Sequence, residues 1–405
     1  GLFGLYASDA RAGIYRTLLM PVVRLLDAED AHRFSILCQK RGLAPRAPDA
    51  RHPWTPAELA AHPLAVTLFG QRLANPVGLA AGYDKHGEAI EANLDLGFAM
   101  VELGSVTPEP QVGNPRPRVF RLVPDAAVIN RYGFNSVGHD AVLANLKDRL
   151  RSLRRPKPPA PEDLVVAEAA AAAAAEAASH AAARPGRMLG INIGKNKHSR
   201  PDDHSDYVRG IQAFAPYADF LVVNISSPNT PGLRALQEAA TLRPLVAAVT
   251  AARAALPPVY RRPIALKIAP DVTPAQLDAI ADIAVEYAID AVILGNTTLQ
   301  RPPTLLAAPK QVREAGGLSG APLRPIALAQ VRALYARLQG RVPIIGCGGI
   351  ATAEDAVAFA KAGATAVQFY TGMVYHGPGT AALLQDGLRA YLAATHQRWE
   401  DLIGQ

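Results

Sequence analysis

The segment Val222–Leu233 gathers side chains that are well suited to catalysis. A short β-branched run predicts a buried strand, which stops at Pro228 and Pro231 because proline has no backbone N–H to donate. The turn displays two amides and three hydroxyls: Asn224, Ser226, Ser227, Asn229 and Thr230. A capped turn would account for one of these groups but not for all of them. The pattern therefore predicts a catalytic site at the carboxyl end of a strand.

Seven other apolar runs end in similar small or polar loops, which indicates one rim of loops around a barrel. The glycine-rich segments Gly346–Gly349 and Tyr370–Gly372 suit a phosphate group, with GGLSG at Gly316–Gly320 as a further flexible backbone segment. The amides and lysine suit a planar heterocycle, because each amide can both donate and accept. No cluster has metal-ligand spacing. A phosphate grip beside a planar-ring pocket suggests a flavin mononucleotide (FMN) enzyme acting on a small ring.

Strands that alternate with helical segments predict an α/β protein with a (β/α)8 TIM barrel. The eight strands are expected near Val77–Ala80, Met100–Leu103, Leu189–Ile193, Phe220–Ile225, Ile264–Ile268, Ala291–Leu294, Pro343–Gly346 and Ala366–Tyr370. A pair of extra strands at the barrel mouth is expected within Arg116–Arg131, and a short hairpin over Ala65–Leu73.

The N-terminal region predicts a separate role. Residues 13–41 read as two helices joined between Pro21 and Asp30, with apolar faces surrounded by cations. Such faces suit either a membrane interface or packing on the barrel, and the residues alone favour neither. We divide the chain into a helical membrane-association segment at 1–44, a connector and hairpin at 45–74, and the barrel at 75–405. A low-complexity, alanine-rich insertion spans about 154–187 and predicts a solvated helix over Ala169–Ala175.

Composition limits the classes of protein to which the chain can belong. The chain has 405 residues, 49% hydrophobic residues and a formal charge of +7, without the basic–aromatic pattern of nucleic-acid binding. Cys38 and Cys347 lie too far apart in sequence for a disulfide framework or a metal motif. No apolar run approaches the roughly 20 residues that span a bilayer. The start at Gly1 indicates that a targeting peptide or an anchor is missing from this chain.

Long, ordered motifs resemble the class 2, quinone-dependent dihydroorotate dehydrogenases of the mitochondrial type. They include NPVGLAAGYDKHGE, ELGSVTPEPQVGNPRPRVFRL, VINRYGFNS, GINIGKNK, VVNISSPNTPGLR, LKIAPD, NTTLQRP, GGLSG, IIGCGG and VQFYTG. The likeness runs from about Ile14 to the C-terminus, without the insertion. It implies oxidation of (S)-dihydroorotate to orotate in pyrimidine (UMP) biosynthesis, with FMN as cofactor and ubiquinone as acceptor. Class 1 enzymes use a cysteine base, and neither cysteine lies in the serine loop, which favours class 2.

The resemblance assigns roles residue by residue. Ser227 matches the base that removes the C5 proton while hydride leaves C6 for the flavin. Because a serine hydroxyl has a high pKa, its proton must be relayed, and Thr230 and Phe134 match that relay. Lys267 would offset negative charge on the reduced flavin, and Ser226 is interpreted as a neighbour of the base. The substrate positions are Lys85, Asn130, Arg131, Tyr132, Gly133, Phe134, Asn224, Asn229, Asn296 and Thr297.

The resemblance also implies a flavin site and a quinone tunnel. The flavin positions are Ala80, Ala81, Gly82, Lys85, Ser105, Asn192, Asn224, Lys267, Gly320, Gly348, Gly349, Tyr370 and Thr371. The tunnel positions are Leu19, Met20, Ala31, His32, Phe34, Arg121 and Tyr370. With this tunnel, the N-terminal helices are expected at a membrane surface, that of the mitochondrial inner membrane or, alternatively, a bacterial plasma membrane. Gly295 departs from the hydroxyl residue found in many relatives.

Two alternatives remain open at this stage. Another FMN barrel could reduce a pyrimidine, such as dihydrouracil or dihydrouridine, although iron–sulfur cysteines and an RNA-binding domain are not evident. A flavin-free phosphate-binding barrel lyase or isomerase would be colourless. The expected partners are dihydroorotate, orotate, ubiquinone and a membrane surface, with no nucleic acid and no metal.

Overall fold

Eight parallel strands close into a barrel in the computed structural model, which describes residues 2–153, 181–230 and 232–405. The barrel strands are β3 (Val77–Leu79), β4 (Met100–Val106), β7 (Met188–Ile193), β8 (Phe220–Asn224), β9 (Ile264–Ile268), β10 (Ala291–Leu294), β12 (Ile344–Cys347) and β13 (Ala366–Phe369). β13 pairs with β3 and closes the ring, with Gln368 opposite Gly78. The predicted (β/α)8 barrel is confirmed.

The strands form where the sequence is nearly continuously apolar, because a parallel barrel buries both faces of each strand. All six residues of β7 and all five of β8 are buried. The predicted strand limits agree to within two residues except at β4, which continues to Val106 rather than ending at Leu103. Glu102 and Lys267 are the charged side chains within these buried strands of the described chain, and they face one another inside the barrel.

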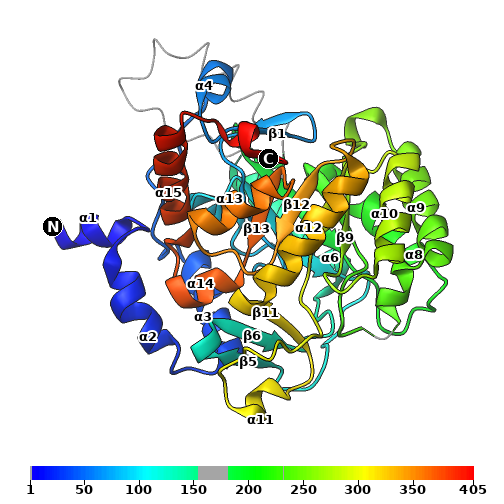
Figure 1. Ribbon diagram of the computed structural model, residues 1–405, viewed down its shortest axis with the longest axis horizontal. Coiled ribbons are helices and arrows are strands. Elements are labelled where there is room, and N and C mark those ends of the chain that lie inside the picture. The colour runs from blue at the N-terminus through cyan, green and yellow to red at the C-terminus, as the bar shows by residue number, and fades with distance from the viewer. Residues whose placement is uncertain (1, 154–180, 231) are drawn as a thin grey trace.

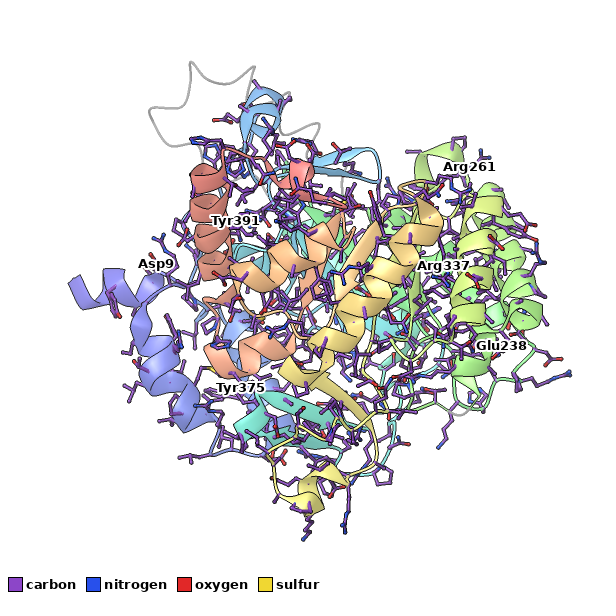
Figure 2. The ribbon with its side chains drawn as sticks, in the orientation of Figure 1. Asp9, Glu238, Arg261, Arg337, Tyr375 and Tyr391 are labelled. Atoms are coloured by element: carbon purple, nitrogen blue, oxygen red, sulfur yellow. The ribbon has the colours of Figure 1, made fainter. Side chains whose placement is uncertain are left out.

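Helices surround the barrel as the fold requires (Figure 1). They are α5 (Ile90–Asp95), α6 (Gly138–Leu153), α8 (Ser205–Phe214), α9 (Ala239–Ala254), α10 (Pro274–Glu286), α12 (Arg324–Leu338), α13 (Ala353–Lys361) and α15 (Thr380–Thr395). Thr273 begins α10 with a capping box that Gln276 completes. On the outer surface, Arg337 of α12 pairs with Asp278 of α10 at 2.5 Å (Figure 2 labels Arg337).

A three-stranded antiparallel sheet lies at the barrel mouth. It contains β5 (Val119–Leu122) and β6 (Ala127–Asn130), as predicted, and a third strand, β11 (Gly317–Gly320), where the sequence predicts only a flexible backbone segment. Glycine allows β11 to approach its neighbours closely. A Cβ at Gly317 would lie 1.8 Å from Thr297 Oγ1, and Gly320, at φ +95°, would place one 2.3 Å from the carbonyl oxygen of Ala126.

The N-terminal region contains one helix more than the predicted pair. α1 (Leu2–Ser8) precedes the pair, and a π-helical turn at Tyr15–Leu19 runs directly into α2 (Met20–Val23). The helices of the pair are separated after Val23, within the predicted joint between Pro21 and Asp30, and Pro21 itself lies inside the first of them. α3 (Ala28–Lys40) follows, with Asp27 as its N-cap. These helices lie against α14 (Thr371–His376) and the β5–β6–β11 sheet (Figure 1).

The connector contains α4 (Pro56–Ala61), and the predicted hairpin forms as β1 (Val66–Leu68) and β2 (Gln71–Leu73). A four-residue helix, α11 (Pro309–Val312), precedes β11. The alanine helix predicted for Ala169–Ala175 lies outside the described residues. The described chain resumes at Ala181. There, the Asp219 carboxylate accepts the N–H groups of Ala181 and Ala182 at 2.7 and 2.8 Å, and Arg149 of α6 donates to the carbonyl groups of both.

Candidate active site

One cavity of about 630 Å³ connects the barrel rim with the N-terminal helices. Its inner half lies at the carboxyl ends of the barrel strands. There it is lined by polar groups from several predicted rim loops, among them Lys85, Ser105, Asn224, Ser227, Lys267, Asn296 and Thr297. Its outer half is lined by side chains of α2 and α3, among them Met20, Ala31, His32 and Phe34. The structure therefore places a polar chamber and an apolar passage in continuous contact.

Ser227 and Ser226 occupy different environments. Ser227 lines the cavity, and its Oγ accepts the backbone N–H of Asn229 at 3.3 Å. Ser226 is fully buried; its hydroxyl donates to Asn224 Oδ1 at 2.7 Å and accepts from Asn296 Nδ2 at 2.9 Å. Ser227 is thus placed to meet a ligand, whereas Ser226 links two loops beneath it.

Arg234 holds the serine loop to its neighbours. Its guanidinium donates to the carbonyl oxygens of Ser226 at 3.0 Å and Thr297 at 2.7 Å, and it pairs with Asp271 at 2.6 Å. One side chain therefore joins the loops that follow β8, β9 and β10. The bidentate geometry of arginine suits this role, which a lysine could not fill.

Lys85 is enclosed at the boundary between the two halves. Its Nζ lies 2.5 Å from Asn135 Oδ1 and 3.5 Å from the centre of the Tyr132 ring. Burial, together with the charge of Arg118, lowers the pKa of Lys85 to about 7. An anionic ligand beside Lys85 would favour the charged form, because opposite charges stabilise each other in a poorly solvated site.

Phe134 takes a left-handed backbone conformation, with φ at +52°. Its carbonyl oxygen accepts Gln111 Nε2 at 2.8 Å, and its ring packs against Gly194, where a Cβ would lie 3.3 Å away. A non-glycine residue in this region is uncommon and is often found at functional sites. The conformation directs the ring into the cavity lining.

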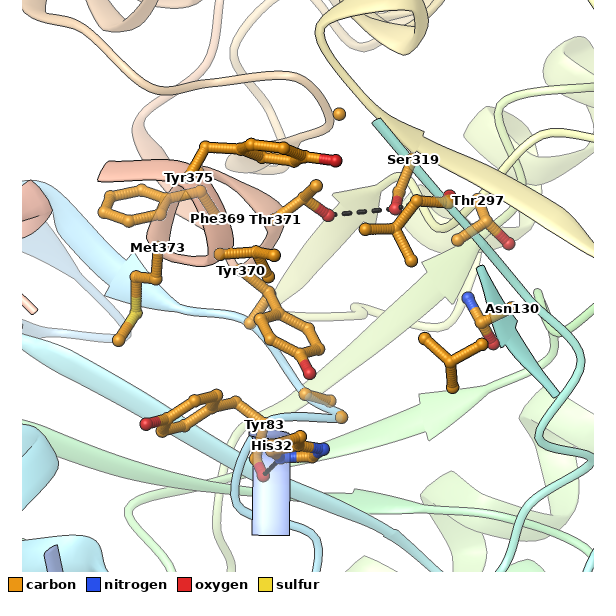
Figure 3. A pocket seen from close by; sticks show the side chains of 18 of the residues that line it. His32, Tyr83, Asn130, Thr297, Ser319, Phe369, Tyr370, Thr371, Met373 and Tyr375 are labelled. Atoms are coloured by element: carbon orange, nitrogen blue, oxygen red, sulfur yellow. Dashed lines mark hydrogen bonds between the residues drawn. The ribbon is translucent and has the colours of Figure 1, made fainter. Parts of the chain in front are cut away.

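The far side of the inner half is built from glycine backbone and hydroxyl groups. Gly320, Gly348, Gly349 and Thr371 line it, and Thr371 Oγ1 donates to Ser319 Oγ at 2.9 Å (Figure 3). A Cβ at Gly349 would fall 2.6 Å from Arg324 Cβ and 2.8 Å from the carbonyl oxygen of Gly320. Close packing of this turn therefore requires glycine at 349, and the glycine backbone that lines the cavity suits an anionic group.

In the outer half, His32, Tyr83 and Tyr370 form an aromatic group (Figure 3). His32 Nε2 lies 2.6 Å from the carbonyl oxygen of Tyr83 and must donate to it, which leaves Nδ1 as an acceptor. Burial lowers the pKa of His32 to about 4, so the ring is neutral near pH 7. Burial also raises the pKa of Tyr370 well above its ordinary value, so its hydroxyl remains a donor.

Arg121 of β5 reaches the N-terminal helices. It donates to the carbonyl oxygens of Arg24 and of Leu26, the latter at 2.6 Å, and so closes the end of α2 against the sheet. Tyr375 of α14 donates to the carbonyl oxygen of Ala127 at 2.6 Å, which holds α14 to the same sheet (Figure 2). Both contacts shape the outer half from residues far apart in sequence.

A buried ion pair joins the two halves. Glu29 of α3 and Arg118, both about 4% exposed, lie 2.9 Å apart, and Arg118 also donates to the carbonyl oxygens of Val112 and Asn114. Although burial alone would raise it, the hydrogen bonds and charge of Arg118 hold the pKa of Glu29 below its ordinary value. The Arg118 guanidinium lies 5.0 Å from the Tyr132 ring centre, next to Lys85.

Three predicted site residues do not line the cavity. Asn192 is fully buried beneath it and reaches the site through Asn224. Thr230 is buried, and its hydroxyl has no hydrogen-bond partner among the described residues. The Arg131 side chain turns away, pairing with Glu314 at 2.7 Å and stacking on Phe120 at 4.5 Å. A substrate contact through the Arg131 side chain is therefore not supported, because that group is already neutralised elsewhere.

Several residues of the site were missed in the sequence. Tyr83, Asn135, Ser319 and Cys347 line the cavity, and burial raises the pKa of Cys347 to about 11. The sequence offers one clear signal of a polar group beneath the site. Glu102 is a lone charge within an apolar strand, and a charge in a buried strand needs a partner. Gly295 also lines the cavity, and a Cβ there would lie 3.2 Å from Pro270.

The fold and the cavity define a barrel enzyme in which one site serves both a polar and an apolar reactant. The family model for dihydroorotate dehydrogenase matches residues 63–392. The chain belongs to the dihydroorotate dehydrogenase family, in its quinone-dependent class, and is an oxidoreductase.

Relatives and a solved structure agree with this assignment. The mitochondrial dihydroorotate dehydrogenase (quinone) of Schizosaccharomyces pombe is 44% identical over 98% of this chain and 87% of its own length. The dihydroorotate dehydrogenase (quinone) of Parvibaculum lavamentivorans is 44% identical over 93% of this chain and 94% of its own. The ligand-free enzyme of Eimeria tenella superposes with a TM-score of 0.80 at 36% identity, covering 93% of this chain and 99% of that one.

Proposed function

We propose that this enzyme oxidises (S)-dihydroorotate to orotate in the inner half of the cavity and passes the electrons to ubiquinone in the outer half. The observation that carries the proposal is the continuous cavity, with Ser227 and the amides at one end and the N-terminal helices at the other. The reaction is a step of pyrimidine biosynthesis. A polar ring acid and a lipid-like oxidant require opposite surroundings, and this cavity offers both.

FMN is the cofactor that fits between the two chambers. Gly320, Gly348, Gly349 and Thr371 would hold its phosphate, at a turn packed so closely that a Cβ at Gly349 would lie 2.6 Å from Arg324 Cβ. Ser105, Asn224 and Lys267 would hold the flat ring, because all three line the cavity beside one another, with Asn224 Nδ2 donating to Ser105 Oγ at 2.9 Å. Bound flavin would supply the redox chemistry, taking a hydride from the substrate and returning electrons to the quinone.

Ser227 is proposed to take the proton from C5 of dihydroorotate. Its Oγ accepts the N–H of Asn229, which favours negative charge on that oxygen while the proton moves. A serine base needs a second proton acceptor, and the buried hydroxyl of Thr230 on the same loop is the candidate, with the Phe134 ring excluding solvent.

The substrate would be held by amides and by charge. Asn229 Nδ2 donates to the carbonyl oxygen of Asn130 at 3.2 Å, which links the serine loop to β6. Thr297 Oγ1 is buried without a hydrogen-bond partner among the described residues, so a ring N–H or C=O could satisfy it. Lys85 would neutralise the substrate carboxylate.

The N-terminal helices are proposed to lie on a membrane, that of the mitochondrial inner membrane. Apolar side chains of α2 and the turn after it face outward: Leu25 is 85% exposed and Val22 54%. α3 carries exposed cations as well, among them Arg33 and Lys40, which pair with Glu29 and Glu88, and cations on these helices suit an anionic lipid surface. In residues 2–153, 181–230 and 232–405, no helix is both long and apolar enough to cross a bilayer.

An acceptor comparison tests the function directly. The purified protein should be yellow, and its flavin should be bleached by dihydroorotate without any acceptor. Reoxidation should be fast with a long-chain quinone and slow with fumarate or NAD. A colourless protein that stays inactive after FMN addition would contradict the proposal, and preference for fumarate or NAD would contradict the quinone assignment.

A further inference from the structure

Polar side chains inside the barrel form one hydrogen-bonded chain that reaches the rim. Four of its members lie on the strands β4, β7, β8 and β9, and two lie in the loops after β8 and β10: Glu102, Lys267, Asn192, Asn224, Ser226 and Asn296. Glu102 lies deepest, with no exposed surface, at the third position of β4. The proposed chemistry uses the rim members of this chain but assigns no role to Glu102.

The carboxylate sets the direction of the first hydrogen bond. An ionised carboxylate only accepts, so Asn192 must present its NH₂ group to Glu102, and the two atoms lie 2.6 Å apart. The carbonyl oxygen of Asn192 then faces the other way and accepts Asn224 Nδ2 at 3.1 Å. The orientation of Asn192 follows from this acceptor-only group, and Asn192 passes the same direction on to Asn224.

The same direction continues to the rim. Because its NH₂ group is used, Asn224 presents Oδ1 to Ser226, whose N–H and hydroxyl donate to it at 3.1 and 2.7 Å. The Ser226 oxygen is then the acceptor for Asn296 Nδ2 at 2.9 Å. Asn296 is left with its Oδ1 towards the N–H of Thr297 at 2.8 Å. A neutral group at the Glu102 position would remove the acceptor that orients Asn192, while the N–H groups of Ser226 and Thr297 would still orient Asn224 and Asn296.

Glu102 also fixes the position of a cation. Lys267 Nζ contacts both carboxylate oxygens, at 3.1 and 3.2 Å, and both side chains are almost fully buried. A buried ammonium without a counter-ion is strongly disfavoured. The pair therefore keeps a charged lysine at the floor of the inner half, with its net field reduced by the carboxylate 3 Å away.

We propose that Glu102 is the positioning residue that fixes both the donor and acceptor pattern of the inner half and the charge balance beneath the flavin. The inference rests on the proposed function, because it names the group that aims Asn224, Asn296 and Lys267 at FMN and the substrate. Glu102 itself does not line the cavity and acts through these side chains.

Glu102→Gln tests this role, with Asp219→Asn as the matched control. Asp219 is another fully buried carboxylate, but it accepts backbone N–H groups at the amino-terminal end of β8, where no rim loop begins. For each variant we would measure the melting temperature of the apoprotein, the reduction potential of bound FMN and kcat/KM for flavin reduction by dihydroorotate.

We expect Glu102→Gln to lower kcat/KM by about tenfold, or 1.4 kcal/mol, and to move the flavin potential to more positive values, because a negative charge is lost beneath the ring. Asp219→Asn should lower the melting temperature while leaving the potential and kcat/KM within twofold of the wild type. Wild-type potential and kcat/KM in Glu102→Gln would overturn the inference, whatever its melting temperature.

Glu102→Asp serves as a second variant if the glutamine variant does not fold. It keeps an acceptor-only carboxylate, so the flavin potential should stay near that of the wild type while kcat/KM falls less than tenfold. A displaced potential in Glu102→Asp would assign the effect to shape rather than charge and would overturn the proposal. If wild-type protein neither binds FMN nor oxidises dihydroorotate, the proposed function fails; if it does both, these variants test Glu102 alone.

Discussion

The inner and outer halves of the cavity are built on different physical principles. The inner half is positioned by directional hydrogen bonds among amides and hydroxyls, such as those of Asn224 and Ser226. The outer half is walled mainly by apolar side chains of α2 and α3, which make non-directional contacts. Directional sites reject ligands that leave a buried polar group unpaired, whereas apolar passages discriminate weakly between chain lengths. We therefore expect strict selection of the ring substrate and tolerance of the quinone tail.

Ser227→Ala is expected to produce the largest difference between the rates of the two half-reactions. Flavin reduction by dihydroorotate should fall by about 10²- to 10⁴-fold, because the proposed base is lost. FMN should remain bound, and reoxidation of chemically reduced enzyme by quinone should be unchanged. Stopped-flow absorbance of each half-reaction measures both.

Ser226→Ala is the comparison for that variant. It leaves Ser227 in place but removes the link between Asn224 and Asn296, so the rate should fall by less than in Ser227→Ala. Equal rates for Ser227→Ala and the wild type would disprove the base assignment.

The ion pair between the halves should show the next largest effect. Glu29→Gln leaves Arg118 buried without its partner, so the free energy of unfolding should fall by about 3 kcal/mol. Because α3 and the loop near Tyr132 share this pair, KM for dihydroorotate and KM for quinone should rise together. Denaturant titration and steady-state kinetics measure these changes.

Arg33→Gln is the matched control, since the exposed Arg33 pairs with the same carboxylate at 3.1 Å. It should change stability by less than about 0.5 kcal/mol. If Glu29→Gln altered only the quinone KM, the two halves would be mechanically independent.

A smaller effect is expected from pH. Lys85, with its pKa lowered to about 7 by burial, is charged below that pH and neutral above it. The affinity of the oxidised enzyme for the orotate anion should therefore weaken by up to tenfold per pH unit above about 7. Flavin difference spectra across pH 6–9 measure the dissociation constant.

Lys85→Met should bind orotate weakly and without this pH dependence. The quinone half-reaction should be insensitive to pH over the same range, because His32, with a pKa of about 4, stays neutral. A pH-independent dissociation constant in the wild type would contradict the role of Lys85.

The smallest effect is expected on the outer surface of α2. Leu25→Ser should weaken binding to anionic vesicles by several-fold, because roughly 1 kcal/mol of apolar contact with lipid is lost. Flavin reduction by dihydroorotate should not change. Val259→Ser, at a 68% exposed apolar position far from α2, is the control and should bind vesicles like the wild type (Figure 2 shows nearby Arg261). Equal vesicle binding by all three proteins would remove the proposed membrane face.

The barrel could be predicted from the sequence because continuous apolar strands and polar strand ends are local signals. The sheet at its mouth was half predicted, because β11 is glycine-rich and becomes a strand only by pairing with β6. The joint predicted between Pro21 and Asp30 lies where the chain breaks, because α2 ends at Val23 and α3 begins at Ala28.

Ion pairs between residues far apart in the sequence could not be predicted from local sequence patterns. Glu29 and Arg118 are 89 residues apart, and Glu102 and Lys267 are 165 apart, so nothing near either residue indicates its partner. The pairing of the Arg131 side chain could not be predicted for the same reason, because Glu314 lies 183 residues away. The roles assigned to Ser227, Thr230 and the tunnel residues stay predictions for the variants above.

The hydrogen bonds that anchor the chain at Ala181 and Ala182 have a practical consequence. Asp219 and Arg149 fix this point from the barrel side, at the end of the barrel opposite the cavity. The segment between Leu153 and Ala181 therefore enters and leaves the fold at anchored positions. A reporter, an affinity tag or a surface linker introduced there would be attached at the end of the barrel opposite the cavity, which would allow the enzyme to be tethered with the cavity facing away from the support.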